Sequence, residues 1–174
     1  MKTCNSAEWA TPQDFFDKLD AEFHFTLDPC STDENAKCEK HYTKEQDGLV
    51  QDWTGETVFC NPPYGRTIGA WCKKCYEHSL NGGTAVMLIH ARTDTKWFHE
   101  WVYGKAEMRF VRGRLHFNGS KWNAPFPSMV AVYTPVKECD KCSLQNIHSW
   151  ACGHCKRNRY LNGDYFTPKQ DYEP

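Results

Sequence analysis

The residues of this chain best suited to chemistry are an Asn-Pro-Pro-Tyr tetrapeptide at residues 61–64, directly after the apolar run at residues 57–60. Two consecutive prolines make a rigid segment, because each fixes its φ angle and lacks an N–H. Asn61 offers an amide oxygen and Pro62 a carbonyl as hydrogen-bond acceptors, while Tyr64 offers a flat ring for stacking. Two acceptors match the two hydrogens of an exocyclic amine. The alternative is an ordinary turn that ends a strand, since Asn and Pro are common turn residues.

A second constellation consists of cysteines near the end of the chain. Cys139 and Cys142 form one Cys-x-x-Cys pair, and Cys152 and Cys155 form another, with nine residues between them. Four thiolates at this spacing predict a structural Zn²⁺ site. Bound zinc contributes ~10–16 kcal/mol in small zinc domains, enough to organise a segment with few apolar residues. The alternative is two reduced thiol pairs without metal.

A third Cys-x-x-Cys pair, Cys72 and Cys75, lies within a predicted helix and has no second pair assigned to it. We therefore predict that both side chains pack in the core and bind no metal. The remaining cysteines, at positions 4, 30, 38 and 60, are predicted to be small apolar fillers.

Length and composition predict one globular domain with a small appendage. The chain has 174 residues, of which 40% are hydrophobic, so it can bury a core. No run of 18 apolar residues is present, and the first residues lack the apolar region of a signal peptide. We therefore expect a cytoplasmic monomer without a membrane partner. In a reducing compartment, paired thiols bind metal more often than they form disulfides.

The charge is distributed unevenly, although its net value is only −1. Residues 1–56 carry 5 Lys and Arg against 13 Asp and Glu, whereas residues 57–174 carry 16 against 9. The second segment is thus the place to expect phosphate contacts. The alternative is a dipolar but otherwise ordinary surface.

The elements that must position these residues alternate between strand and helix. Thr11 and Pro12 are typical of a helix start. In chain order we expect a helix at 13–21, strands at 23–28 and 57–60, a helix at 67–80, a strand at 84–89, a helix at 94–101, and strands at 107–111, 115–117 and 129–133. This order predicts an α/β fold with a mostly parallel sheet and an antiparallel end. The composition changes after Pro135, so we predict a main domain at residues 1–135 and an appendage at residues 136–174.

Several segments together resemble a known family. In chain order they are Trp9-x-Thr11-Pro12, Leu27-Asp28-Pro29-Cys30, Asn35-Ala36-Lys37-Cys38, Asp47-Gly48-Leu49, Asn61-Pro62-Pro63-Tyr64-Gly65, Ala91-Arg92-Thr93-Asp94-Thr95, Arg112-Gly113-Arg114 and Ala124-Pro125-Phe126-Pro127-Ser128-Met129. This series is similar to the phage-type DNA N6-adenine methyltransferases, the Dam-like group, over roughly residues 8–135. The resemblance implies a Rossmann-like sheet that binds S-adenosylmethionine, double-stranded DNA as substrate, and a phage or prophage gene expressed in a bacterial host cell. The zinc segment lies outside it.

The resemblance also implies roles for single residues. Asn61, Pro62, Pro63 and Tyr64 are implied to be catalytic: the first two hold the amine of a flipped adenine, and Tyr64 stacks on the base. The implied cofactor contacts are Trp9, Thr11, Pro12, Asp28, Pro29, Asp47, Asp52 and Trp53.

Within that set, the resemblance places Thr11 and Pro12 beside the methionine carboxylate and Asp28 beside the ammonium group. Asp52 and Trp53 correspond to the acid and the aromatic residue that contact the adenine of the cofactor, with Asp47 as a second candidate. One departure concerns residues 29–32, Pro-Cys-Ser-Thr, which replace the usual glycine-rich loop after the first strand. A second strand with a ribose-binding acid is not evident either.

Six basic residues in the second half are candidate DNA contacts: Lys96, Lys105, Arg109, Arg112, Arg114 and Lys121. If residues 112–114 form a hairpin tip, their arginines can reach guanine edges. Trp122 and Phe126 are either further stacking residues or part of the core.

Three other functions remain open from the sequence. The same tetrapeptide serves methyl transfer to an RNA adenine or to a protein glutamine. A different class is a catalytically inactive zinc-ribbon module that binds nucleic acid. The intact set of Asp28, Asn61 and Tyr64 argues against an inactive sheet.

Overall fold

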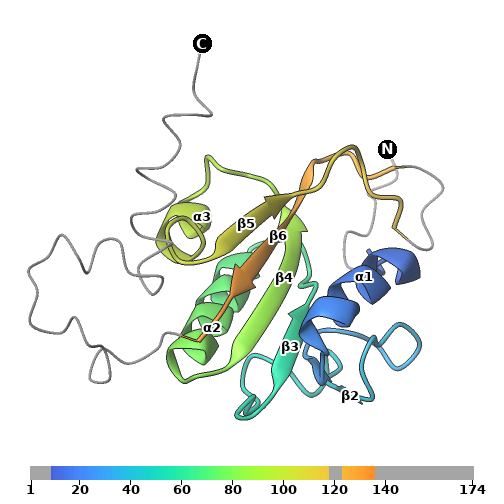
Figure 1. The fold of residues 1–174 in the computed structure, drawn as a ribbon, viewed down its shortest axis with the longest axis vertical. Coiled ribbons are helices and arrows are strands. Elements are labelled where there is room, and N and C mark those ends of the chain that lie inside the picture. Colours follow the sequence, from blue (N-terminus) through green and yellow to red (C-terminus); the bar gives the residue numbers. More distant parts are fainter. Residues whose placement is uncertain (1–8, 118–122, 136–174) are drawn as a thin grey trace, which may run out of the picture.

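The computed structural model describes residues 9–117 and 123–135, which form three helices and a six-stranded sheet (Figure 1). The helices are α1 (Gln13–Phe23), α2 (Ile68–Leu80) and α3 (Lys96–Trp101). The strands are β1 (Leu27–Asp28), β2 (Lys40–His41), β3 (Thr57–Cys60), β4 (Thr84–His90), β5 (Glu107–Phe110) and β6 (Ser128–Tyr133). The sheet order is β2-β1-β3-β4-β6-β5, which confirms the predicted α/β class.

The directions of the strands bring five strand ends to one edge of the sheet. β2, β1, β3 and β4 are parallel, and β6 runs antiparallel between β4 and β5. His90 of β4 pairs with Ser128 of β6, and Phe110 of β5 pairs with Met129. β2, β1, β3, β4 and β5 therefore all end on the same side. We call this side the carboxyl edge and the opposite side the amino edge.

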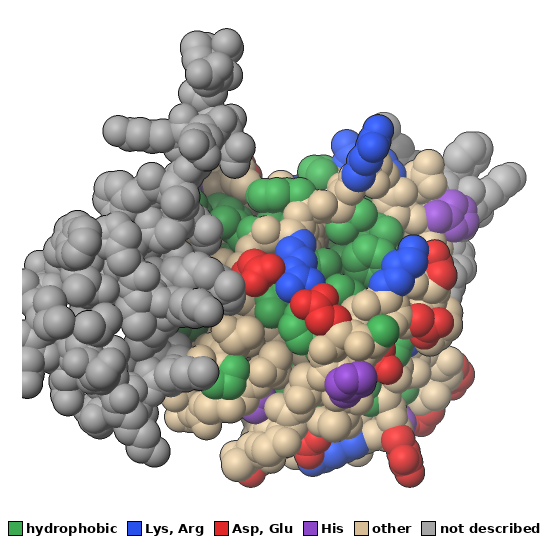
Figure 2. Space-filling view, viewed as in Figure 1, with side chains coloured by type: hydrophobic (Ala, Val, Ile, Leu, Met, Phe, Trp, Pro, Cys, Tyr) green, Lys and Arg blue, Asp and Glu red, His purple; other side chains and the backbone are tan. Residues whose placement is uncertain are grey.

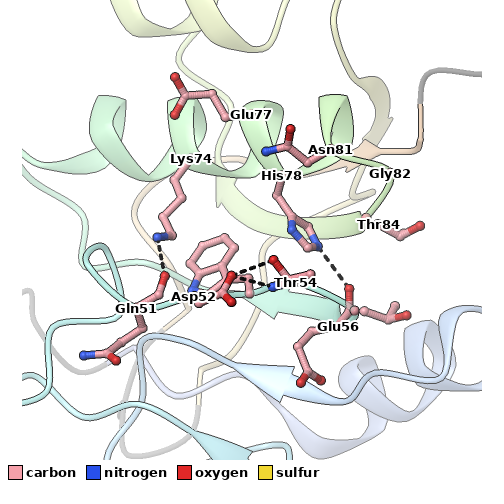
Figure 3. A pocket seen from close by; sticks show the side chains of 14 residues that line it. Gln51, Asp52, Thr54, Glu56, Lys74, Glu77, His78, Asn81, Gly82 and Thr84 are labelled. Atoms are coloured by element: carbon pink, nitrogen blue, oxygen red, sulfur yellow. Dashed lines mark hydrogen bonds between the residues drawn. The ribbon is translucent and has the colours of Figure 1, made fainter. Parts of the chain in front are cut away.

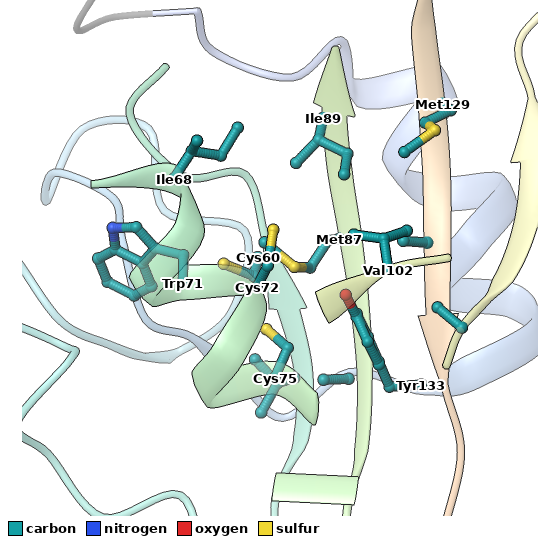
Figure 4. Close-up of a cluster of buried hydrophobic side chains, with 14 of the residues drawn as sticks. Cys60, Ile68, Trp71, Cys72, Cys75, Met87, Ile89, Val102, Met129 and Tyr133 are labelled. Carbon is teal, nitrogen blue, oxygen red and sulfur yellow. The ribbon is translucent and has the colours of Figure 1, made fainter. Parts of the chain in front are cut away.

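Both faces of the sheet are covered, which explains why its central strands read as continuous apolar runs. Met87 and Ile89 of β4 belong to the cluster under α2 and α3, which Figure 4 shows. Val86 and Leu88 belong to the cluster that α1 covers. Successive side chains alternate between the two faces, as the pleat of a strand requires. Each such fully buried side chain contributes roughly 1.5–3 kcal/mol to stability.

The strand predicted at residues 23–28 is shorter in the structure because α1 continues to Phe23. His24 then adopts a left-handed φ of 55° and ends the helix. The backbone N–H of Phe25 donates to the side chain of Asp20 (2.8 Å). The strand ladder begins only after this segment, so β1 contains two residues.

Other differences concern short elements. β2 was not predicted, because a two-residue strand leaves no alternating pattern to detect. The strand predicted at residues 115–117 does not form, and the helix predicted at 94–101 begins at Lys96 as α3. The predicted helix at residues 67–80 agrees with α2 to within one residue.

The cysteines of α2 confirm the packing prediction: Cys72 and Cys75 are fully buried in the core beside Cys60. Within residues 9–117 and 123–135, no group of three or more His, Cys, Asp or Glu side chains could hold a metal ion. The predicted zinc ligands Cys139, Cys142, Cys152 and Cys155 lie outside the described residues, as do Lys121 and Trp122. The described helices include none with the length and apolarity of a membrane span.

Candidate active site

The loops that follow β1 and β3 meet at the carboxyl edge. Asn61 comes directly after β3, and Asp28 is the last residue of the neighbouring strand β1. Between them, the sulfur atoms of Cys30 and Cys60 lie 3.6 Å apart, and the backbone N–H of Asn61 donates to the sulfur of Cys30. The structure thus brings the implied cofactor acid and the tetrapeptide into one site.

The side chain of Asn61 is held in one orientation. Its amide nitrogen Nδ2 donates to the backbone carbonyl of Trp9 (2.7 Å) and to Oγ1 of Thr11 (3.0 Å). Its amide oxygen Oδ1 is buried and accepts no hydrogen bond. Because both donors of the amide have partners, the group presents a pure acceptor to the site.

Unpaired buried polar atoms gather at the carboxyl edge. Within the described ranges, four buried side-chain atoms lack a hydrogen-bond partner, and all four lie there: Ser31 Oγ, Asn61 Oδ1, His90 Nδ1 and Ser128 Oγ. Ser31 lies in the loop after β1, while His90 ends β4 and faces Ser128, the first residue of β6. Such atoms are rare in folded proteins, and their concentration here marks this edge as the candidate site.

Tyr64 is supported by a stack of rings. Its ring lies parallel to that of His90 (centroids 5.0 Å apart, planes at 21°), and His90 lies parallel to Trp97 (5.5 Å, 14°). Phe126 packs edge-on against Tyr64 (5.2 Å) and against Trp9 (5.6 Å). Burial lowers the pKa of His90, so its imidazole is neutral at physiological pH. The stack fixes the Tyr64 ring before any base arrives.

Asp28 is a buried acid, with only 4% of its surface exposed. Oδ1 accepts from the backbone N–H of Cys30 (3.4 Å) and Oδ2 from that of Lys37 (3.1 Å). Burial raises the pKa of the carboxyl to about 6, although these two hydrogen bonds act in the opposite direction. A cation bound beside Asp28 would restore its full ionisation.

The structure separates the three residues implied for the cofactor adenine. Asp47 and Gly48 lie against the loop after β1, since a Cβ on Gly48 would fall only 1.9 Å from the carbonyl oxygen of Pro29. Asp52 and Trp53 instead line a cavity at the amino edge. Asp47 is therefore at the edge that carries Asn61, and Asp52 and Trp53 are not.

That amino-edge cavity has a volume of about 480 Å³ and lies between the start of β3, the start of β4 and the end of α2 (Figure 3). Asp52 accepts from the backbone and the hydroxyl of Thr54, as the figure shows. Trp53 is 3% exposed and donates its Nε1 hydrogen to the carbonyl of Gly48 (3.0 Å). Trp53 therefore acts as a core residue between the two edges.

A second, open cavity of about 520 Å³ lies beside β2. One of its lining residues, Gln46, directly precedes Asp47 in the sequence. Its lining residues are Asp33, Glu39, Lys40, His41, Thr43, Glu45 and Gln46. His41 pairs with Asp28 in the sheet, so this cavity adjoins the acid at the end of β1. Neither cavity includes a residue of the tetrapeptide.

Three of the predicted DNA contacts have partners within the protein. Arg109 forms two hydrogen bonds with Glu22 of α1 (2.6 and 2.8 Å) and one with Glu107 (2.8 Å). Lys96 pairs with Glu100, and the ammonium of Lys105 lies 5.6 Å from the centroid of the Tyr76 ring. Arg109 therefore joins β5 to α1, a role that the sequence did not reveal.

Four arginines at the carboxyl edge are exposed. Arg112 and Arg114 follow β5, as predicted; Arg66 follows the tetrapeptide, and Arg92 follows β4. The positive charge of Arg92 adds to burial in lowering the pKa of His90, which places it near the ring stack. Within the described ranges none of the four has an acidic partner within 4 Å. Figure 2 shows basic side chains at the top, in the middle and at the lower end of the described part of this face.

Arg66 and Arg92 were not among the predicted DNA contacts, because most of those residues lie in one strand-rich segment. Both lie in a loop that follows a parallel strand, Arg66 between β3 and α2 and Arg92 between β4 and α3. Ligands bind at this edge in open α/β sheets.

The family model described as DNA N-6-adenine-methyltransferase (Dam) matches residues 1–148. The chain belongs to this family. A protein of Haemophilus phage HP1 (strain HP1c1) named DNA N-6-adenine-methyltransferase is 32% identical over 135 residues, covering 73% of this chain and 78% of the phage protein. A protein of Escherichia phage T1 with the same name is 31% identical over 109 residues, covering 62% of this chain and 45% of the T1 protein.

Proposed function

We propose that this chain transfers a methyl group from S-adenosylmethionine to N6 of adenine in double-stranded DNA, with a Rossmann-like sheet as the scaffold. The observation that carries the proposal is the buried, unpaired Oδ1 of Asn61, whose amide nitrogen is held by Trp9 and Thr11. A fixed acceptor of this kind suits an amine, not a carbonyl. Family membership supports the same activity.

The residues at the carboxyl edge suit the donor. S-adenosylmethionine supplies a methyl group made electrophilic by its bond to a positively charged sulfur. Asp28 offers a buried carboxylate for the ammonium group of the donor, and Asp47 lies on the same side. The open cavity of about 520 Å³ beside β2 offers room for a nucleoside.

Asn61 and Pro62 act on the adenine amine. The lone pair of N6 is delocalised into the ring, so the amine is a weak nucleophile in its planar form. Hydrogen bonds from both N–H groups to Asn61 Oδ1 and to the Pro62 carbonyl favour a tetrahedral nitrogen. These bonds strengthen as positive charge develops on N6, so they stabilise the transition state more than the ground state.

The proton balance requires no tuned base. The N–CH₃ bond forms as the S–CH₃ bond breaks, and S-adenosylhomocysteine leaves. The methylated nitrogen is then strongly acidic and releases one proton to water. The neutral His90 in the ring stack has no part in this step.

Adenine in a duplex hides its N6, so the base must leave the stack, which costs a few kcal/mol. Stacking against the rigid, half-buried ring of Tyr64 offsets part of this cost. Arg66, Arg92, Arg112 and Arg114 stand round the same edge and are suited to the phosphates on either side of the extruded base.

Incubation with radiolabelled S-adenosylmethionine tests this function. Duplex DNA, RNA and a protein mixture are offered separately, and the labelled product is hydrolysed and identified. We expect N6-methyladenine from the duplex and no label in Asn61→Ala. Label confined to an RNA adenine or to a protein glutamine would replace DNA as the substrate.

We also propose that residues 136–174 form a separate zinc-binding appendage held by Cys139, Cys142, Cys152 and Cys155. The spacing of the four thiolates supports it. We expect one zinc ion per chain by atomic absorption and less than half of that in Cys142→Ser. Equal zinc in both proteins would rule out the four-cysteine site. Size-exclusion chromatography with light scattering tests the monomer.

A further inference from the structure

The backbone N–H groups of the loop after β1 already donate hydrogen bonds within the protein. In place of a glycine-rich turn, residues 29–32 begin with a proline, which has no N–H. The N–H groups of residues 30–32 donate to Asp28 Oδ1 (3.4 Å), to the carbonyl of Tyr42 (3.2 Å) and to Asn35 Oδ1 (2.8 Å). No backbone N–H of this turn therefore points free toward an anion. A carboxylate bound here needs a side chain as its partner.

Lys37 supplies a cation at this place. Its backbone N–H donates to Oδ2 of Asp28, so the start of its side chain is fixed beside the acid. Its ammonium donates to Oε1 of Gln13 (2.8 Å), in the first turn of α1 and directly after Thr11 and Pro12. An ammonium has three hydrogens, so two remain for a ligand.

The ammonium of Lys37 and the carboxylate of Asp28 do not pair directly. Within the described ranges no ion pair within 4 Å joins them. Even so, the charge of each group affects the pKa of the other. Burial lowers the pKa of the Lys37 ammonium and the charge of Asp28 opposes that change. A separated acid and cation match an amino acid, which carries an ammonium and a carboxylate on the same carbon.

An unpaired hydroxyl in the same loop points to a ligand. Oγ of Ser31 is buried and has no hydrogen-bond partner among the described residues. Its backbone N–H is already used, so only the side chain remains to contact a bound molecule. A hydroxyl can donate to a carboxylate and so complete its coordination.

We propose that Lys37 binds the α-carboxylate of S-adenosylmethionine while Asp28 accepts from its α-ammonium group. The amino-acid end of the donor is thus held by two side chains of opposite charge, in place of the backbone amides of a glycine-rich loop. This assignment rests on the proposed methyltransferase function.

The test compares two ligands that differ in the amino-acid end. S-adenosylhomocysteine carries the carboxylate and the ammonium, whereas 5′-methylthioadenosine has neither. Calorimetric titration of Lys37→Gln should show S-adenosylhomocysteine binding weakened by roughly 10-fold or more, the size of a lost charged hydrogen bond. Binding of 5′-methylthioadenosine should stay within 2-fold of the wild type, which also shows that the variant is folded.

Two further variants complete the test. Lys44→Gln removes the same charge from an exposed lysine nearby and should bind both ligands as the wild type does. Lys37→Arg keeps the charge and should recover most of the affinity for S-adenosylhomocysteine. Unchanged binding in Lys37→Gln, or an equal loss for both ligands, would overturn the assignment. A wild-type protein that binds neither ligand would overturn the methyltransferase proposal itself.

Discussion

The two edges of this sheet differ in how their buried polar groups are satisfied. At the amino edge, the cavity of about 480 Å³ is lined by groups that already have partners: Lys74 donates to two backbone carbonyls, and His78 contacts the carbonyl of Glu56. At the carboxyl edge, four buried polar atoms have none. The presence of a cavity thus does not by itself make the amino edge the better candidate for chemistry. Buried polar atoms without hydrogen-bond partners distinguish a candidate site from a cavity that merely separates helices and strands.

The largest expected effect comes from Asn61, compared with an asparagine at the other edge. Asn61→Ala should lower kcat for DNA methylation by roughly 10²–10³-fold, the range for loss of one preorganised transition-state contact. Asn81→Ala, which alters the lining of the amino-edge cavity, should leave kcat unchanged. Steady-state kinetics with a duplex oligonucleotide gives both values. Comparable losses in the two variants would remove the distinction between the edges.

The next prediction compares two exposed arginines with Arg109, which forms ion pairs within the protein. Arg66→Gln and Arg92→Gln should each weaken duplex binding by roughly 10-fold and reduce the slope of log K against log salt by about 1. Arg109→Gln should leave that slope unchanged and lower the free energy of unfolding by about 1 kcal/mol, because its partly exposed pairs with Glu22 and Glu107 are lost. Fluorescence anisotropy and urea unfolding measure the two quantities. A reduced salt slope in Arg109→Gln would show that this arginine reaches DNA after all.

A smaller effect distinguishes the two acids that the resemblance offered for the cofactor adenine. Asp47→Asn should weaken S-adenosylhomocysteine binding by about 5-fold, the size of one modest hydrogen bond. Asp52→Asn should have no effect, since its carboxylate is bound to Thr54 at the amino edge. Calorimetric titration decides between them, and the reverse result would restore Asp52 as the adenine contact.

The smallest expected effect is a pH dependence of cofactor binding. The Asp28 carboxyl must be ionised to hold an ammonium group, and burial raises its pKa to about 6. Affinity should therefore fall as the pH drops through this value, by about 4-fold between pH 7.5 and pH 5.5 if this group alone titrates. His41 on β2 faces Asp28, and its pKa is raised mainly by its hydrogen bond to Asp33, with a further contribution from the charge of Asp28. The variant Asp28→Asn removes the titration of Asp28 together with its contribution to the pKa of His41. An unchanged pH profile in that variant would assign the dependence to another group.

The sequence predicted those parts of the fold that depend on local pattern. The apolar runs at β3, β4 and β6 and the periodicity of α2 follow from burial on both faces of a sheet. The tetrapeptide after β3 could be read directly, because a loop after a parallel strand lies at the ligand-binding edge.

The rest depends on contacts between distant residues. Glu22 and Arg109 are 87 positions apart, so nothing local shows that the arginine is already bound. Asp47 and Asp52 are five positions apart and yet lie at opposite edges, because the chain between them crosses beside α2, where Lys74 binds the carbonyls of Leu49 and Gln51. Their spacing in the sequence does not show that the chain passes from one edge of the sheet to the other between them.

The amide of Asn61 is oriented by residues that precede it by 50 and 52 positions. A shortened protein that begins at α1 would retain every strand of the sheet and still lack Trp9 and Thr11. The amide would then be free to rotate, and could turn its NH₂ toward the adenine amine, donor against donor. Mutational libraries and fusion designs for this enzyme should therefore treat the stretch ahead of α1 as part of the catalytic apparatus.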